Sequence, residues 1–277
     1  MELVFSSEGV DSAAGRLASP LVEGRPFSLP IPAGTTPSPT RYCDLAEPYR
    51  RLARELSGGR LARHALCHLD PDLDPKALAE RPPGWRAALG QWGAALGHLR
   101  AQGVGVGDVF LFWGLYRDAV RRRCRWVFSG PRKHCLFGWL AIGEVLEAGS
   151  DGSHCTNGRP WLADHPHARP GWSVNNAIFV AANRLEVAGQ IFPGSGLFAQ
   201  AYPLTAPDAA GPSDWKIPVW LDPAQGGTGL SCNPPKRWRG GRLTTAPRGQ
   251  EFVADAGERE DAQQWLGNLL STCAARL

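Results

Sequence analysis

The sequence lacks the features that mark several large classes of protein. No run approaches the roughly 18 to 20 apolar residues that are needed to cross a bilayer. The first ten residues, MELVFSSEGV, have neither the basic start nor the apolar core of a signal peptide. We therefore expect a cytoplasmic protein without a membrane partner.

Cysteine pairs and nucleotide-binding loops are also missing. The seven cysteines are odd in number and scattered, and none forms the CxxC pair of a zinc or redox site, so we expect reduced thiols. The chain has no Gly-Lys-Ser/Thr of a P-loop and no Rossmann fingerprint, which argues against a nucleotide cofactor. It has no internal repeat and no low-complexity tract.

What is present indicates one α+β domain spanning residues 1–277. A hydrophobic content of 43% supports a sizeable core at this length. Short apolar runs separated by Pro, Gly and Asp turns predict short strands and long loops, with a few helices. The segment 84–103 predicts the clearest helix, on a stripe that includes Trp85, Leu89 and Leu96. On that helix Gln91 and His98 would share a separate strip away from the apolar stripe, where His98 either faces a site or is a hydrogen-bonded structural histidine.

Two apolar strands after this helix, VFLFW and LFGWLAIGEVL, predict a long β-hairpin with a bulge or bend at the interior glycines. Segment 84–147 resembles the small β-barrel domains of the PUA, ASCH and EVE group, which commonly bind RNA or modified DNA bases. The resemblance implies a PUA-like barrel core.

Positive charge is concentrated between the two hairpin strands. The segment 117–133 carries seven cations against Asp118 alone, so its net charge is +6 in a chain whose total is +4. Such a patch favours a phosphate backbone as partner, held by Arg117 and Arg125, with Trp126 stacking on a base. The alternative is a solvated, arginine-rich loop.

Two short segments have the composition of metal sites. In ALCHLDPDLDP, an extended His68-x-Asp70 would point both side chains to one face, and Asp72 would continue the row. In LADHPHARPGW, His165 and His167 have the same spacing. Imidazole and carboxylate together suit iron, zinc or manganese, although Asp-Pro pairs are also ordinary turn builders.

A third segment, APRGQEFVADA, holds Arg248, Gln250 and Glu251 in front of a strand. Arg248 suits a phosphate, and Glu251 suits a general acid or base or a ligand, while a charged hairpin edge is the alternative. Asp11 lies in a small-residue loop near the N-terminus.

The ordered series GVDSAAG, SLPIP, HLDPDL, GQWGAALGHL, GVGDVFLFWGLYR, FGWLAIGEVL, HPH, NNAIFVA, WKIPVW and RGQEFV resembles the third of the nucleotide-modification-associated domain families over nearly the whole chain. That family, found in bacteria and phages, is predicted to modify bases in nucleic acids. The positions that match its pattern are Asp11, His68, Asp70, Asp72, Gln91, His98, Asp108, His165, His167, Arg248, Gln250 and Glu251. The chain departs from the pattern at Glu8, where a basic residue is expected, and in the arginine-rich insertion.

These observations predict a metal-dependent enzyme that modifies a nucleobase, nucleotide or related substrate, with non-haem iron as the metal and zinc or manganese as the alternatives. The predicted ligands are His68, Asp70, His98, His165, His167 and Asp11. Glu251 and Asp72 are the predicted proton carriers. The predicted substrate contacts are Arg248, Gln250, Gln91, Arg117, Arg125 and Trp126. One alternative is a reader of modified bases, without catalysis, that uses an aromatic cage of Trp113, Trp126 or Trp139. Another is a metalloenzyme of a biosynthetic pathway that acts on a small molecule or peptide.

Overall fold

The computed structural model describes residues 1–11, 13–246 and 251–274. Three α-helices are present in this part of the chain: α1 (Tyr49–Leu56), α2 (Gly93–Ala101) and α3 (Glu260–Cys273). Short 3-10 turns cluster at 152–168 and 219–237. None of the described helices is long and apolar enough to cross a membrane. All seven cysteines are free thiols.

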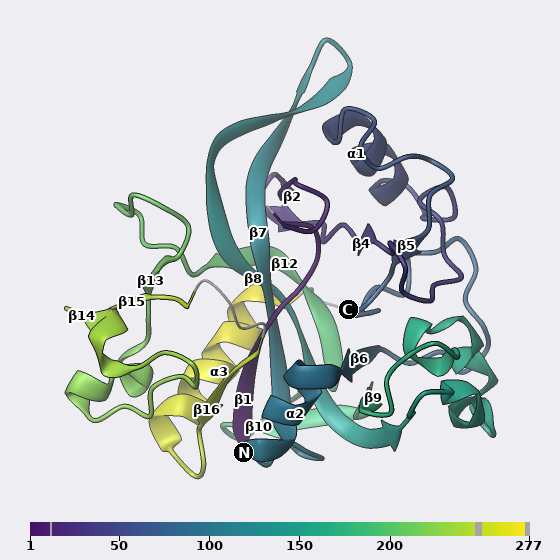
Figure 1. Cartoon of the computed structure of the whole chain (residues 1–277). Coiled ribbons are helices and arrows are strands. Elements are labelled where there is room, and N and C mark those ends of the chain that lie inside the picture. Colours follow the sequence, from purple (N-terminus) through teal and green to yellow (C-terminus); the bar gives the residue numbers. More distant parts are fainter. Residues whose placement is uncertain (12, 247–250, 275–277) are drawn as a thin grey trace.

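The main sheet has the order β16-β1-β7-β8-β9-β6, with β12 and β2 pairing to β8 and β7 off this path (Figure 1). Its strands are β1 (Glu2–Ser7), β2 (Ser19–Val22), β3 (Arg25–Pro26), β6 (Ala88–Trp92), β7 (Val109–Arg122), β8 (Arg125–Glu147), β9 (Asn176–Ala181), β12 (Ser195–Pro203) and β16 (Glu251–Asp255). Smaller sheets are formed by β4 (Ile31–Pro32) with β5 (Cys67–His68), by β10 (Arg184–Val187) with β11 (Gln190–Pro193), and by β13 (Asp214–Lys216), β15 (Arg242–Thr244) and β14 (Trp238–Arg239).

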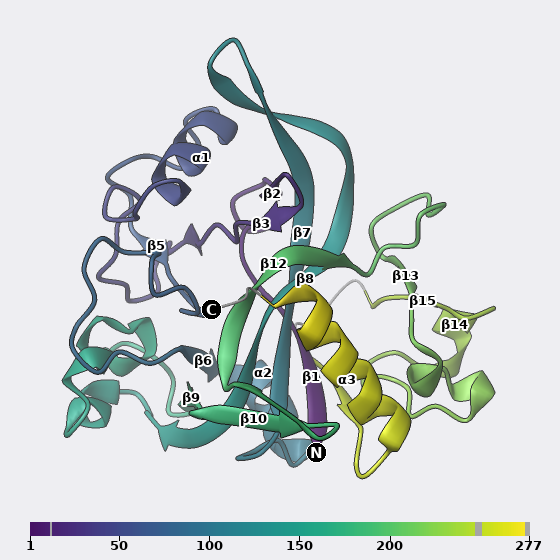
Figure 2. The same ribbon diagram turned by 180° about the vertical axis from the view of Figure 1, so that it is seen from behind.

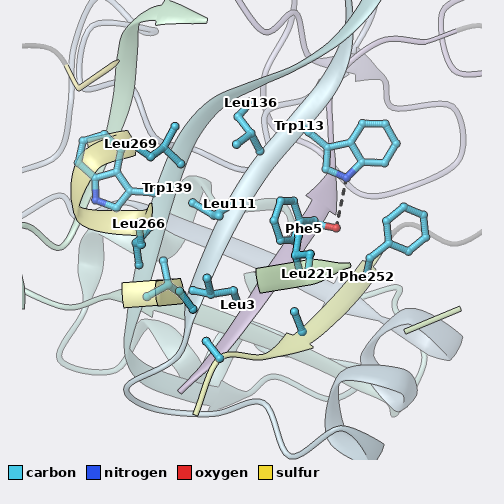
Figure 3. Close-up of a cluster of buried hydrophobic side chains, with 14 of the residues drawn as sticks. Leu3, Phe5, Leu111, Trp113, Leu136, Trp139, Leu221, Phe252, Leu266 and Leu269 are labelled. Carbon is cyan, nitrogen blue, oxygen red and sulfur yellow. Dashed lines mark hydrogen bonds between the residues drawn. The ribbon is translucent and has the colours of Figure 1, made fainter. Parts of the chain in front are cut away.

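The buried stretches of the central strands are largely apolar because both faces of the sheet are covered there. On β7, Leu111 and Trp113 belong to one buried cluster, whereas Phe110 and Phe112 belong to another. The first cluster lies under α3, which crosses the sheet in the rear view (Figure 2). Figure 3 shows this cluster, in which the Trp113 indole donates a hydrogen bond of 3.2 Å to the carbonyl of Phe5. Leu96 and Leu99 of α2 join the second cluster. This alternation follows from the period of two in a strand.

The predicted hairpin is confirmed, and so is its bend. Strands β7 and β8 pair from Val109 to the turn, with register shifts between Phe112 and Trp113 and between Arg117 and Asp118. The pairing of β8 with β9 shifts again at Gly143. A closed barrel is not found among the described residues, so the PUA-like barrel is not confirmed: the edge strands β6 and β16 do not pair. The coarser prediction of a sheet-rich fold with a few helices is confirmed.

The helix predicted at 84–103 is wrong in its first half. Residues 88–92 form β6, which pairs with β9 from Ala88 opposite Val180 to Trp92 opposite Asn176. Leu89 and Ala88 face different buried clusters, so both faces of this strand are covered, and its apolar residues imitate a helical stripe. Gly93, with φ of +59°, ends the strand and begins α2. Gln91 and His98 therefore lie on different elements.

Candidate metal centre

Three histidines surround one buried carboxylate. His68 Nε2 lies 3.5 Å from Asp70 Oδ2, His167 Nε2 lies 3.4 Å from the same oxygen, and His165 Nε2 lies 3.8 Å from Oδ1. One ligand atom from each of His68, Asp70 and His167 fits within a span of 4.8 Å. We call His68, Asp70, His165 and His167 the His/Asp group. The two short segments predicted as metal sites therefore meet.

Local backbone geometry explains why the side chains converge. His68 ends β5, and Asp70 follows two residues later, so their side chains point to the same side. His165 is extended, with φ of −75° and ψ of 131°, and Pro166 begins a short 3-10 turn after it. In that turn the backbone N–H of His167 donates to Nδ1 of His165 at 3.2 Å, which leaves Nε2 of His165 directed at Asp70.

Neighbouring residues fix the other members of the group. Asn176 Oδ1 lies 2.6 Å from His167 Nδ1, which selects Nε2 as the free nitrogen of that ring. Trp172 stacks on the His167 ring, with 3.8 Å between centroids. The backbone N–H of Gly90 donates to both oxygens of Asp70 at 3.0 Å. A Cβ at Gly90 would overlap the His167 ring, so only glycine fits there.

The protonation of the group suits a cation. Burial lowers the pKa of His165, and it lowers the pKa of His167 to about 4, so both rings are neutral at pH 7. Burial acts to raise the pKa of Asp70, but its contact with His68 and the adjacent imidazoles outweigh burial, and the pKa lies below its usual value. Two buried ring nitrogens, Nδ1 of His68 and Nε2 of His165, have no hydrogen-bond partner among the described residues. Buried imidazoles with free nitrogens around an anionic carboxylate form a donor set for a divalent metal.

A second polar group lies next to the His/Asp group. Glu251 begins β16 opposite Ser6 of β1, and the Ser6 hydroxyl lies 3.1 Å from Glu251 Oε1 and 3.0 Å from Glu8 Oε1. Gln91 donates to Glu251 Oε1 at 2.6 Å, a side-chain bond that joins the two edge strands of the main sheet. We call Ser6, Glu8, Gln91 and Glu251 the glutamate cluster. Gln91 follows Gly90, so β6 links this cluster to Asp70.

The pKa of Glu251 is raised to about 8, mainly by burial and further by the charge of Asp70. The hydrogen bonds from Ser6 and Gln91 act in the opposite direction but are outweighed. Burial, followed by the charge of Glu251, also raises the pKa of Glu8 well above its usual value. The Glu251 Oε2 atom is buried without a partner in the described chain. The cluster therefore holds at least one carboxyl that keeps its proton near neutral pH.

Other predicted site residues lie elsewhere or are already engaged. Asp72 forms two bonds of 2.6 Å with Arg81 and accepts one from Trp85, so both of its oxygens are occupied. His98 lies on α2, and its Nε2 is 2.9 Å from the hydroxyl of Ser231, in the loop before β14. Asp11 caps its own turn through the backbone N–H groups of Ala13 and Ala14. No hydrogen bond or ion pair joins these three to the His/Asp group within residues 1–11, 13–246 and 251–274, although Asp72 and His165 line the same pocket.

The remaining predictions divide into three cases. Asp108 accepts from the backbone N–H groups of Glu2 and Gly105, and so braces the start of β1. Arg248 and Gln250 lie outside the described residues. Trp113 and Trp139 are buried in the core, so they do not form the aromatic cage of a base reader. Sequence reasoning missed Gly90, Trp172 and Asn176 as supports; only the polar Asn176 at the head of an apolar strand was a visible signal.

The chain is similar to one protein family over most of its length. The family model described as Nucleotide modification associated domain 3 matches residues 2–255 of the 277. The chain belongs to this family. No curated protein and no solved structure matches it. The matched range includes the whole His/Asp group, and it also includes Ser6, Glu8, Gln91 and Glu251. Membership associates the chain with the modification of nucleotides, and a nucleic acid or nucleotide is the substrate class that the family name supports.

Proposed function

We propose that the chain is a metal-dependent enzyme that modifies a nucleobase, with the metal held by His68, Asp70, His165 and His167. The convergence of three buried histidines on Asp70 is the observation that carries the proposal. Burial of ring nitrogens without partners is costly unless something else binds them. Iron is the proposed metal, with zinc or manganese as alternatives that suit the same donors.

The chain's own residues divide the remaining work. A His and carboxylate site with open positions activates dioxygen when it holds iron, and activates water when it holds zinc. Asn176 and Trp172 hold the His167 ring in its orientation. Glu251 keeps a proton near neutral pH in a buried position beside the site, which suits a general acid. Asp72 lacks a free oxygen for this task, since Arg81 and Trp85 occupy both.

Metal content per chain tests the proposal directly. Protein purified without oxygen is analysed for iron, zinc and manganese, together with the variants Asp70→Asn and His167→Ala. We expect about one metal ion per chain in the wild type, because one carboxylate and three imidazoles make a single site. Both variants should lose most of it. The matched control is His64→Ala, which removes an exposed histidine outside the group.

His98→Ala decides whether that histidine belongs to the site: unchanged metal content would exclude it as a ligand. Activity is read as a new nucleoside by mass spectrometry after the protein is incubated with DNA, RNA or free nucleotides and the products are digested. A folded Asp70→Asn variant that keeps the wild-type metal content would refute the site. A product formed only from a small molecule or peptide would keep the metal site and replace the substrate class.

A further inference from the structure

The paired strands β7 and β8 extend beyond the main sheet as a two-stranded arm. Both views show the arm projecting past the rest of the molecule (Figures 1 and 2). The pairing continues without a gap from Asp118 opposite Ser129 to Arg122 opposite Arg125, where a two-residue turn closes it. We call residues 118–129 the arm. It carries most of the arginine-rich insertion in which this chain departs from its family pattern.

One face of the arm is attached to α1. Ala119, Trp126 and Phe128 pack in a cluster with the apolar residues of that helix. The backbone N–H of Trp126 donates to Glu55 at 2.7 Å. Arg121 and Arg117 lie over the rings of Trp126 and Phe128, with 5.9 and 5.8 Å to the centroids. These contacts attach the arm to α1 and leave Trp126 half-buried, so the stacking of Trp126 on a base stays a prediction.

The other face and the tip carry arginines that nothing in the described chain neutralises. Arg122 and Arg125 are directly opposite each other, so their side chains leave the arm on the same side. Like charges in this arrangement destabilise a strand pair. Both are exposed, as is Arg123 at the turn, and none of the three forms an ion pair with a described residue.

The turn itself is strained. Arg123 and Cys124 have φ of +48° and +63°, a region that favours glycine or asparagine in a two-residue hairpin turn. Strain of this kind costs about 1 to 3 kcal/mol for each residue and concentrates at functional sites. Charge repulsion and backbone strain thus both destabilise the tip, which nevertheless exposes three guanidinium groups at the end of an arm held by α1.

We propose that this tip binds the phosphate backbone of duplex nucleic acid. The proposal rests on the proposed function, and it deepens it by making a polymer, rather than a free nucleotide or a small molecule, the substrate. Guanidinium groups match phosphate oxygens in pairs, and a two-stranded β-ribbon fits the major groove. An anionic membrane is the less suitable partner, because the tip presents Arg and Cys where a membrane-binding segment presents large apolar side chains.

The test compares two double variants that remove the same charge. Arg122→Thr with Arg125→Thr removes two arginines from the arm and keeps residues that favour strands. The control, Arg184→Thr with Arg239→Thr, removes two exposed strand arginines that also lack an ion pair with any described residue. Binding of a short labelled duplex DNA is measured by fluorescence anisotropy over a series of salt concentrations.

Because each phosphate contact contributes about one unit to the slope of log K against log salt, the arm variant should bind more weakly and lose about two units of slope. The control variant should keep the wild-type slope. Arm and wild-type slopes that coincide, or a wild type that does not bind DNA, would overturn the proposal. So would loss of binding to vesicles containing phosphatidylserine with DNA binding unchanged, which would identify a membrane as the partner.

Metal content separates this proposal from the previous one. The arm variant should retain wild-type iron, because the arm contributes no residue to the His/Asp group. A protein that binds DNA through the arm and contains no metal would refute the proposed function and leave the arm proposal standing. A protein that contains metal and modifies nucleotides, but binds DNA equally well without the arm arginines, would refute the arm proposal and leave the proposed function standing.

Discussion

The Ser6 hydroxyl has one hydrogen but two carboxylate oxygens within hydrogen-bond distance, one from Glu8 and one from Glu251. Both contacts are satisfied together only if one carboxyl carries a proton and donates it to the Ser6 oxygen. This count agrees with the raised pKa values of the two glutamates. Each carboxyl alone would look like a buried acid, but together they store one proton beside Asp70.

The Glu251→Gln variant should change how stability depends on pH. Between the usual pKa of a glutamate, 4.5, and the value of about 8 in the folded chain, the folded state keeps a proton that the unfolded state releases. The free energy of unfolding therefore falls as pH rises through this range, by up to about 1.4 kcal/mol per pH unit. Glutamine removes this contribution, so the stability of the variant relative to the wild type should increase with pH.

Chemical denaturation of the metal-free proteins at several pH values measures this difference. Histidines contribute equally to both proteins, so the difference between the two curves isolates Glu251. Two curves that stay parallel from about pH 5 to pH 8 would show that Glu251 is ionised throughout this range. Glu8→Gln, which removes the other carboxyl of the pair, shows which of the two holds the proton.

At the scale of elements, strand β6 determines the geometry of the site. Strand β6 supplies Gly90 for Asp70 and His167 and Gln91 for Glu251, whereas α2 packs on the core and its His98 bonds to Ser231 instead. Gly90→Ala should therefore displace the His167 ring and reduce metal content strongly while the sheet stays folded. Gly97→Ala is the matched control, because its nearest atom, Asn175 Nδ2, is 3.8 Å from the new Cβ.

The control should bind metal normally and gain up to about 1 kcal/mol in stability from the higher helix propensity of alanine. Metal analysis and thermal denaturation of both variants are the measurements. Equal metal content in Gly90→Ala and Gly97→Ala would mean that the His167 ring can move without leaving the site, and that the close fit at Gly90 serves packing alone.

The β7 and β8 hairpin is the element that the sequence predicts best, because two apolar runs flank a single polar segment. Residues 88–92 were misread because a strand buried on both faces has no alternation, and five residues cannot distinguish the two periods. Tertiary pairing with β9 decided the conformation there.

At the scale of the whole molecule, the site depends on contacts that no local pattern contains. Residues 68–70 and 165–167 come together because β6 and β9 are neighbours in the sheet and each carries support for one segment, Gly90 and Asn176. The spacing of His68 with Asp70 and of His165 with His167 predicted two half sites. Their meeting, and the engagement of His98 with Ser231 and of Asp72 with Arg81, follow only from the fold.

Because the ligands come from distant segments, a metal that binds them binds the folded chain and not the unfolded one. Addition of Fe²⁺ to metal-free protein without oxygen should therefore raise the midpoint of thermal unfolding. At one hundred times the dissociation constant the gain is about 2.7 kcal/mol, which is about 5 to 10 °C for a chain of this size. Asp70→Asn should show no such rise, whereas His64→Ala should behave like the wild type. An equal rise in Asp70→Asn would place the ion elsewhere, on residues that the fold does not gather around Asp70.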